Sequence, residues 1–227
     1  MSMQNPSRSV KALIFDFGGV LVRTESHEPR RQVAERLGLS PEELYAIVFE
    51  SEASILAELG RMSSRERWQR VSNLLGLQSA EECVAIMQEF FSGDVLDTEL
   101  VKCIRRMHGR YKMALLSNFT DRLPRLIENE FGLGDCFDAI IVSALVGVRK
   151  PDPAIYHLAL ERLQVAPEEA VFIDDMPENV RAAASLGIHA IQFKSREALC
   201  AELSTLLGDK FEAQDSTSDR MEHPKSP

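Results

Sequence analysis

The feature that most constrains this fold is a series of five short apolar runs separated by stretches of helical pattern. Polar and apolar residues alternate little within the runs, which is typical of strands buried on both faces of a parallel sheet. The expected strands are residues 12–15, 113–116, 139–142, 170–173 and 190–193. The expected helices are residues 98–107, 123–129, 153–163, 177–186 and 196–207. Strands that alternate with helices predict an α/β fold with a doubly wound, Rossmann-like parallel sheet.

Residues 23–93 interrupt this alternation, because they contain no convincing strand. Ser40 and Pro41 are residue types that begin helices, at the N-cap and in the first turn. The helical patterns of this stretch cover residues 28–37, 42–50, 63–75 and 80–91. The pattern therefore predicts a small all-helical domain that is inserted after the first strand.

These observations divide the chain into three parts. Residues 9–22 and 94–208 are expected to form one discontinuous α/β core, and residues 23–93 the helical insertion. Residues 209–227 contain almost no apolar side chains to bury, so we expect a disordered tail there.

The composition disfavours a polyanionic partner. The formal net charge is -9, and an acidic surface repels nucleic acid and anionic lipid. No apolar stretch reaches the about 20 residues that a membrane-spanning helix needs. The four cysteines have neither metal-binding nor redox spacing, which favours reduced thiols in a cytoplasmic protein. We expect no nucleic acid and no membrane as partners, and the oligomeric state stays open.

Polar side chains follow three of the expected strands. Asp16 follows the first, Ser117 and Asn118 the second, and Asp174 and Asp175 the fourth. Because the carboxyl ends of parallel strands meet at one edge of a sheet, these residues are expected to converge there. A ligand site is therefore predicted at this edge.

The three aspartates predict a cation. Asp16, Asp174 and Asp175 would repel one another strongly if they were left unpaired in a low-dielectric site. A few hard oxygen ligands beside a phosphate site suit Mg²⁺. The alternative is an acidic cluster that faces water.

A second group of residues suits phosphate. Ser117 offers a hydroxyl and Asn118 an amide, and the loop that follows them can offer backbone N–H groups. Lys150 precedes a helix that begins with proline, and its side chain can reach the phosphoryl group as a point charge. Gly18 and Gly19 would let the backbone approach a metal and a phosphate closely, although a simple turn explains them too.

The four segments that contain these candidate site residues, in this order, resemble the motifs of the haloacid dehalogenase-like (HAD) superfamily. The resemblance covers residues 11–207. Asp16 falls at the nucleophile of its first motif, and Ser117 at the serine or threonine of its second. Lys150 falls at the lysine of the third motif, and Asp174 with Asp175 at the acidic pair of the fourth. The helical insertion resembles the cap domain of the subgroup whose cap follows the first strand.

The resemblance implies a Mg²⁺-dependent phosphatase that acts on a small phosphorylated metabolite. Asp16 would attack phosphorus and form an aspartyl-phosphate, which water then hydrolyses. The metal would be held by Asp16, by the backbone carbonyl of Gly18 and by Asp175. Asp174 and Asn179 would support the site.

The transferring phosphoryl group would be bound by three further residues of the motifs. These are Ser117, Asn118 and Lys150. Catalysis would then consist mainly of positioning and charge neutralisation.

One position departs from the family pattern. Family phosphatases usually carry a second aspartate two residues after the nucleophile, and this chain has Gly18 there. Loss of a general acid–base typically costs about 10²–10⁴-fold in rate. One explanation is that the enzyme is slow or acts on substrates with good leaving groups. Another is that Glu25 or His27 serves as the general acid–base in place of the missing aspartate. Alternatively, the protein is a catalytically impaired phosphate-ligand binding or regulatory protein on the same scaffold.

Other chemistries fit the sequence less well. A 2-haloacid dehalogenase needs no acidic pair such as Asp174 and Asp175, and a phosphonate-cleaving member needs a cap lysine, which residues 23–93 lack. A kinase would place a nucleotide-binding lobe before the Asp-Phe-Gly at residues 16–18.

The substrate stays open, because cap side chains determine specificity in this architecture. Helical spacing does not decide whether Arg23, Arg65 and Trp68 face the site. For Trp68, Phe90 and Phe91 the simplest expectation is the hydrophobic core of the insertion or its contact with the sheet.

Overall fold

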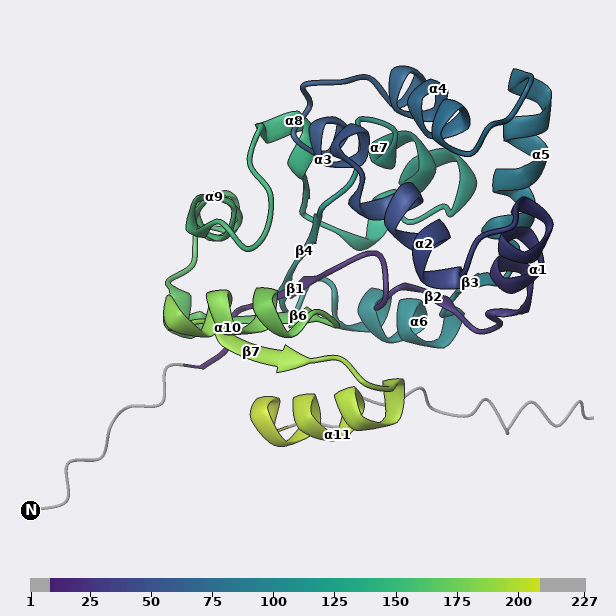
Figure 1. Cartoon of the computed structure of the whole chain (residues 1–227). Coiled ribbons are helices and arrows are strands. Elements are labelled where there is room, and N and C mark those ends of the chain that lie inside the picture. Colours follow the sequence, from purple (N-terminus) through teal and green to yellow (C-terminus); the bar gives the residue numbers. More distant parts are fainter. Residues whose placement is uncertain (1–8, 209–227) are drawn as a thin grey trace, which may run out of the picture.

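A computed structural model describes residues 9–208 and contains a five-stranded parallel sheet (Figure 1). The strand order is β5-β4-β1-β6-β7, so the chain winds outward from β1 in both directions. The strands are β1 (Ala12–Phe15), β4 (Lys112–Ser117), β5 (Ala139–Val142), β6 (Ala170–Asp174) and β7 (His189–Gln192). The predicted doubly wound α/β fold is thereby confirmed, with each strand within a few residues of its expected position.

The central strand β1 is paired on both sides over its whole length. Phe15, its last residue, stands opposite Leu115 of β4 and Ile173 of β6. The Asp16 backbone N–H donates to the carbonyl of Ile173 at 2.9 Å, which extends the ladder one residue further. This register brings the ends of β1, β4 and β6 to the same level of the sheet.

Helices cover both faces of the sheet, because the side chains of each strand alternate between them. On one face, Leu13 and Phe15 pack with residues of α6 and α11; on the other, Ile14 packs with residues of α9 and α10. The helices of this core are α6 (Thr98–Met107), α7 (Leu123–Arg125), α8 (Ser143–Val146), α9 (Pro153–Leu163), α10 (Pro177–Ser185) and α11 (Arg196–Leu207). The π-helical turn η2 (Leu126–Glu130) continues α7, and the 3-10 turns η3 (Gly134–Cys136) and η4 (Pro167–Glu169) precede β5 and β6.

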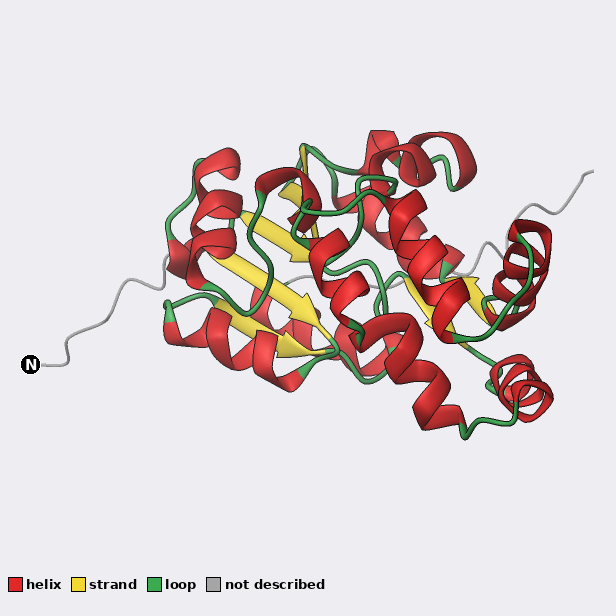
Figure 2. Ribbon diagram, turned by 45° about the horizontal axis from the view of Figure 1, so that its top comes forward, coloured by secondary structure: helices red, strands yellow, loops and turns green. Residues whose placement is uncertain are grey.

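The chain between β2 and β3 forms the helical insertion, whose helices span residues 28–90. It contains α1 (Glu28–Leu37), α2 (Pro41–Tyr45), the π-helical turn η1 (Ala46–Glu50), α3 (Glu52–Glu58), α4 (Ser64–Leu74) and α5 (Ala80–Phe90). In Figure 2 the strand arrows of the main sheet point toward these helices. The insertion therefore lies at the carboxyl ends of the strands.

The helical insertion has a hydrophobic core of its own, built around Val33, Leu44 and Phe90. Trp68 and Phe91 pack against this cluster as expected, with ring centroids 6.3 Å apart and the rings edge to face. Such edge-to-face pairs stabilise a core beyond the area that they bury.

A two-stranded antiparallel sheet, which the sequence analysis missed, joins the insertion to the core. Its strands are β2 (Val22–Thr24) and β3 (Asp94–Leu96). Asp97 follows β3, caps α6 through the Leu100 N–H and pairs with Arg23 and Arg196, each at 2.8 Å. This buried carboxylate ties both connecting strands to the core.

Two short helices were also missed, α3 in the insertion and α8 after β5. The predicted tail at residues 209–227 lies outside the described residues. Within residues 9–208, no helix is both long enough and apolar enough to cross a bilayer.

Candidate active site

The ends of β1 and β6 bring three aspartates together at the centre of the sheet edge. Carboxylate oxygens of Asp16, Asp174 and Asp175 all lie within 4.8 Å of one another. Asp16 is 7% exposed and Asp174 is fully buried, whereas Asp175 is half-buried. The convergence that the sequence predicted is therefore present for this group.

Lys150 lies between two of these carboxylates although it comes from a distant loop. Its Nζ is 2.9 Å from Asp16 Oδ1 and 2.6 Å from Asp174 Oδ2, and it donates to the Leu116 carbonyl at 3.1 Å. The side chain is 1% exposed, and an ammonium has three hydrogens to donate. Three acceptors therefore hold this buried charge in one position.

Burial controls the protonation of the site. Burial raises the pKa of Asp16 to about 7, against the lowering effect of the Lys150 ammonium and with a further increase from the Asp174 charge. Burial and the charge of Asp174 also raise the pKa of Asp175. Although burial lowers the pKa of Lys150, the carboxylates of Asp16 and Asp174 raise it above its ordinary value. The site therefore resists further negative charge unless a cation enters.

The hydrogen bonds distinguish the three aspartates. Asp174 Oδ1 accepts from the Met176 N–H, and the Asn179 amide contacts both Asp174 oxygens at 3.0 and 3.1 Å. Together with Lys150, these donors fill the coordination of Asp174. Asp16 and Asp175 keep oxygens with capacity for a metal.

The residues present fit a hard divalent cation. Their donors are carboxylate oxygens, the type that Mg²⁺ prefers. Gly19 has φ +78°, and a side chain on it would place Cβ 2.3 Å from Asp175 Oδ2. The absence of a side chain at Gly19 therefore lets the Asp175 carboxylate lie against the backbone that follows Asp16.

The residues that end β4 have different partners. Ser117, the last residue of β4, is 2% exposed. The Asn118 side chain donates to the Lys150 carbonyl at 3.0 Å and accepts from the Lys150 N–H at 2.8 Å. The amide that the sequence analysis offered to phosphate is therefore engaged in fixing the Lys150 backbone.

Gly18 faces open space. A Cβ built on this residue would have no atom of the structure within 4 Å, and its φ lies outside the left-handed region. Glu25 and His27, the two sequence candidates for its missing function, are exposed residues before α1.

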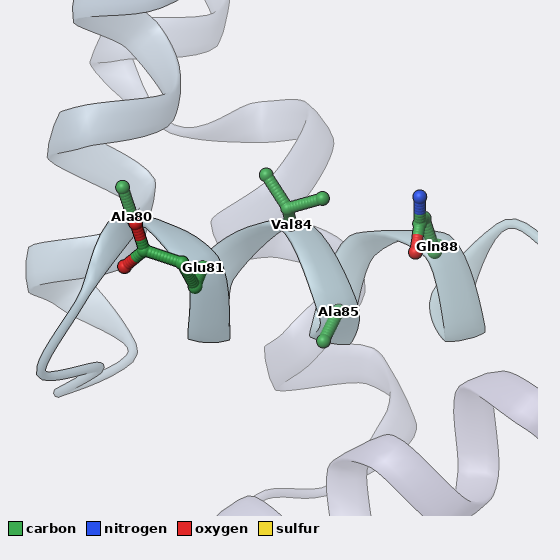
Figure 3. A pocket seen from close by; sticks show the side chains of 5 residues that line it. All are labelled: Ala80, Glu81, Val84, Ala85 and Gln88. Carbon is green, nitrogen blue, oxygen red and sulfur yellow. The ribbon is translucent and has the colours of Figure 1, made fainter.

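Three other candidates from the insertion have structural partners or lie on the surface. Arg23 pairs with Asp97, and Trp68 packs in the core of the insertion. Arg65 is exposed on α4. A shallow hollow on the outside of α5 is lined by this helix alone, and its Val84 and Ala85 point to different sides (Figure 3). It contains none of the converging residues.

The parallel sheet, with charged residues gathered at its central carboxyl edge, is an α/β fold with a candidate ligand site at the end of β1. Residues 10–187 match the family described as haloacid dehalogenase-like hydrolase. The chain belongs to this family, which confirms the resemblance seen in the sequence.

Known relatives include proteins named as phosphatases. The chain is 28% identical to a sesquiterpene phosphatase of Aspergillus oryzae, over 87% of this chain and 97% of the relative. It is 26% identical to a D-ribitol-5-phosphate phosphatase of Bacteroides thetaiotaomicron, over 87% and 98%. It is also 33% identical to mouse acyl-CoA dehydrogenase family member 10, but the match spans 88% of this chain and 19% of that longer protein.

A solved structure shares the fold. A HAD-family enzyme from Bacteroides thetaiotaomicron, crystallised in complex with magnesium and inorganic phosphate, aligns with a TM-score of 0.69. The match has 23% sequence identity and covers 83% of this chain and 96% of the other. At this level of sequence identity, the match shows that the two proteins share a fold.

Proposed function

We propose that this protein is a magnesium-dependent phosphatase that hydrolyses a small phosphate monoester through an aspartyl-phosphate on Asp16. The observation that carries this proposal is the Lys150 ammonium, 2.9 Å from Asp16 and 2.6 Å from Asp174 at the carboxyl edge of the sheet. A fixed positive charge beside a buried carboxylate suits attack on a phosphoryl group, whose oxygens it neutralises. The relatives named as phosphatases support the same reaction class.

The reaction proceeds in two displacements at phosphorus. A carboxylate oxygen of Asp16 attacks phosphorus, and the bond from phosphorus to the leaving oxygen breaks. The leaving oxygen takes a proton from solvent, because Gly18 has no acidic side chain that could donate one. Water then attacks phosphorus, loses a proton to solvent and releases inorganic phosphate as the bond to Asp16 breaks.

Each residue of the site has a role in these steps. Asp16, the Gly18 carbonyl and Asp175 would hold Mg²⁺, which when bound neutralises charge on the carboxylates and on the phosphoryl group. Lys150 and the Ser117 hydroxyl bind phosphoryl oxygens, as do backbone N–H groups after β4.

The supporting residues act on the position of Lys150. Asp174 and Asn179 orient its ammonium, because Asp174 accepts from both. Asn118 fixes its backbone. We therefore assign Asn118 to positioning, with its backbone N–H still available to phosphate.

The helical insertion is proposed to act as a cap over the substrate, with residues 23–93 as the cap and residues 9–22 and 94–208 as the core. Its location at the carboxyl ends of the strands supports this role (Figure 2). None of the four cysteines, all within residues 9–208, forms a disulfide, which fits the proposed cytoplasmic location.

Release of inorganic phosphate from a panel of metabolite monoesters tests the proposal. We expect release that requires Mg²⁺, stops with a chelator and is lost in Asp16→Asn. Equal release by Asp16→Asn and the native protein would rule out Asp16 as the nucleophile.

A second candidate function is phosphate-ligand binding without turnover, and the empty space at Gly18 favours it. Binding of a phosphate ester without release of phosphate would support this alternative. Sustained turnover that Asp16→Asn abolishes would rule it out.

A further inference from the structure

We infer that the substrate is an aryl phosphate, a monoester whose phenol leaves phosphorus as an anion without a general acid. The inference rests on the proposed phosphatase function and names the leaving-group class for that site. It is carried by the side chains around Asp16, which hold the nucleophile in place but have no proton for a leaving oxygen.

The loop between the nucleophile and β2 contains no proton-donating side chain. Its residues have either a buried hydrocarbon side chain or none: Phe17, Gly18, Gly19, Val20 and Leu21. A Cβ on Gly18 would have no atom within 4 Å except those of its chain neighbours. Within residues 9–208, no other side chain therefore fills the position that a residue larger than glycine would occupy.

All three hydrogens of the Lys150 ammonium already have acceptors. Its Nζ lies 2.9 Å from Asp16 Oδ1, 2.6 Å from Asp174 Oδ2 and 3.1 Å from the Leu116 carbonyl oxygen. When Asp16 bonds to phosphorus, the hydrogen that Asp16 accepted can pass to a phosphoryl oxygen, as proposed above. The leaving oxygen lies in line with the attacking one, on the far side of phosphorus, so a group that contacts the nucleophile cannot reach it.

The backbone before α1 leads away from this loop. The Gly19 N–H donates to the Val22 carbonyl at 2.8 Å, which holds the start of β2 beside the loop. Because a strand rises about 3.3 Å per residue, the backbone of Glu25 lies about 10 Å beyond Val22. There the Glu25 N–H donates to the Gly93 carbonyl at 2.9 Å. Glu25 and its neighbour His27 are therefore not positioned as replacements for an acid at the loop.

These observations restrict the leaving group. The bond from phosphorus to the leaving oxygen breaks as the bond to Asp16 forms, and the electron pair stays on that oxygen. Without an acid, the rate depends on how stable the resulting anion is. A phenol has a pKa of about 10, as in tyrosine, and an alkanol is a far weaker acid. A phenolate can leave first and take its proton from solvent afterwards.

Met176 provides an apolar contact beside the same site. It follows Asp175 directly, and its backbone N–H donates to Asp174 Oδ1 at 2.8 Å. Its side chain is 41% exposed although its backbone is held against the acidic group. A methionine thioether makes favourable contacts with aromatic rings. This second observation favours a leaving group that is both acidic and aromatic.

A series of ring-substituted phenyl phosphates, with phenols from weakly to strongly acidic, tests the inference. We expect kcat/KM of the native protein to rise at least about tenfold along the series, and to be at least about tenfold higher for phenyl than for cyclohexyl phosphate. In Gly18→Asp, which restores an acid, the rise along the series should shrink to less than about threefold. Gly134→Asp, at a glycine of η3 whose φ also lies outside the left-handed region, is the control that should keep the native dependence.

Met176→Ala should raise KM for phenyl phosphate about 2–10-fold and leave kcat and the dependence on phenol acidity unchanged, whereas Met176→Leu should keep most of the affinity. An unchanged KM in Met176→Ala would overturn the ring contact.

Equal kcat/KM along the series in the native protein would overturn the inference, as would no hydrolysis of any aryl ester or the same dependence in Gly18→Asp. Hydrolysis of alkyl esters alone, lost in Asp16→Asn, would overturn the inference and keep the proposed function. Release that survives Asp16→Asn would overturn the proposed function itself.

Discussion

The charged side chains of individual buried residues determine the chemistry of the site. Lys150 has three acceptors, and Asp174 receives donors from the Lys150, Met176 and Asn179 groups. Such a network is stable only when every member is satisfied, because an unpaired charge in a low-dielectric interior is costly. The arrangement leaves Asp16 and Asp175 as the groups that can respond to a metal and a substrate.

Gly18→Asp should increase the rate of phosphate release. The new carboxyl would enter open space from a backbone that tolerates a side chain, and it would supply the missing acid–base. We expect a gain toward the about 10²–10⁴-fold typical of such a group, measured as kcat on one monoester. Gly19→Asp is the matched control: its φ of +78° and its contact with Asp175 predict loss of activity. An unchanged rate in Gly18→Asp would show that acid–base chemistry does not limit turnover.

Lys150→Met should destabilise the metal-free protein. Without the ammonium, Asp16 and Asp174 would face each other unpaired, which costs about 3–5 kcal/mol in comparable buried pairs. The measurement is the free energy of unfolding in urea with a chelator present. Lys102→Met, which removes an exposed ion pair to Glu99, should change the free energy of unfolding by at most about 1 kcal/mol. Similar values for the two variants would contradict the described network.

At the scale of elements, the sequence predicted the parts whose pattern is local. The apolar runs predicted all five parallel strands, because burial on both faces leaves no polar position in β1. Convergence of Asp16 with Asp174 followed from the rule that parallel strands end at one edge. Trp68 was correctly assigned to a hydrophobic core, since large aromatic residues rarely stay exposed.

Other elements depend on contacts that no local pattern contains. Strands β2 and β3 have three residues each and are paired across the whole insertion, so neither shows a periodicity of its own. The short α3 begins after Ser51, a residue type that caps helices, so its start was predictable from the sequence. The partner of the Asn118 amide is 32 residues away, and only the fold brings Lys150 there.

Asp97→Asn should weaken the connection between the insertion and the core. It removes the charge that pairs with both Arg23 and Arg196, and charge-assisted hydrogen bonds of this kind are each worth about 1.5–3 kcal/mol. We expect a loss of about 2–3 kcal/mol in the free energy of unfolding. Asp135→Asn, in an exposed pair with Arg105, should leave the free energy of unfolding nearly unchanged. No difference between them would mean that Asp97 does not anchor β2 and β3.

At the scale of the whole molecule, the acidic site is expected to make the free energy of unfolding depend on metal and on pH. The net charge of -9 already opposes compaction, and the three central aspartates add local repulsion. A cation bound only by the folded state stabilises it by mass action. Ligand binding and folding are therefore expected to be linked in this protein.

The metal-free protein should lose stability as the pH rises from about 4 to about 7. The pKa of Asp16 is raised from 3.8 to about 7 in the folded state, so folding favours its protonated form. This contribution is fully present below the unfolded pKa and is lost as the pH passes the folded one. Urea midpoints at about pH 5 and about pH 7.5 measure the effect, and Asp16→Asn, which keeps the raised pKa of Asp175, is the control that should show a smaller loss. Mg²⁺ should raise the urea midpoint more at the higher pH than at the lower one. An equal increase at both pH values would contradict the raised pKa of Asp16.

In the proposed reaction, the carboxylate of Asp16 carries the phosphoryl group during turnover. Borohydride reduction of the working enzyme converts an aspartyl-phosphate to homoserine, and mass spectrometry of the peptides locates it. We predict homoserine at position 16 in the native protein with Mg²⁺ and substrate, and none when Lys150 is replaced by methionine. Phosphate release with an unmodified Asp16, or with homoserine at another aspartate, would contradict it.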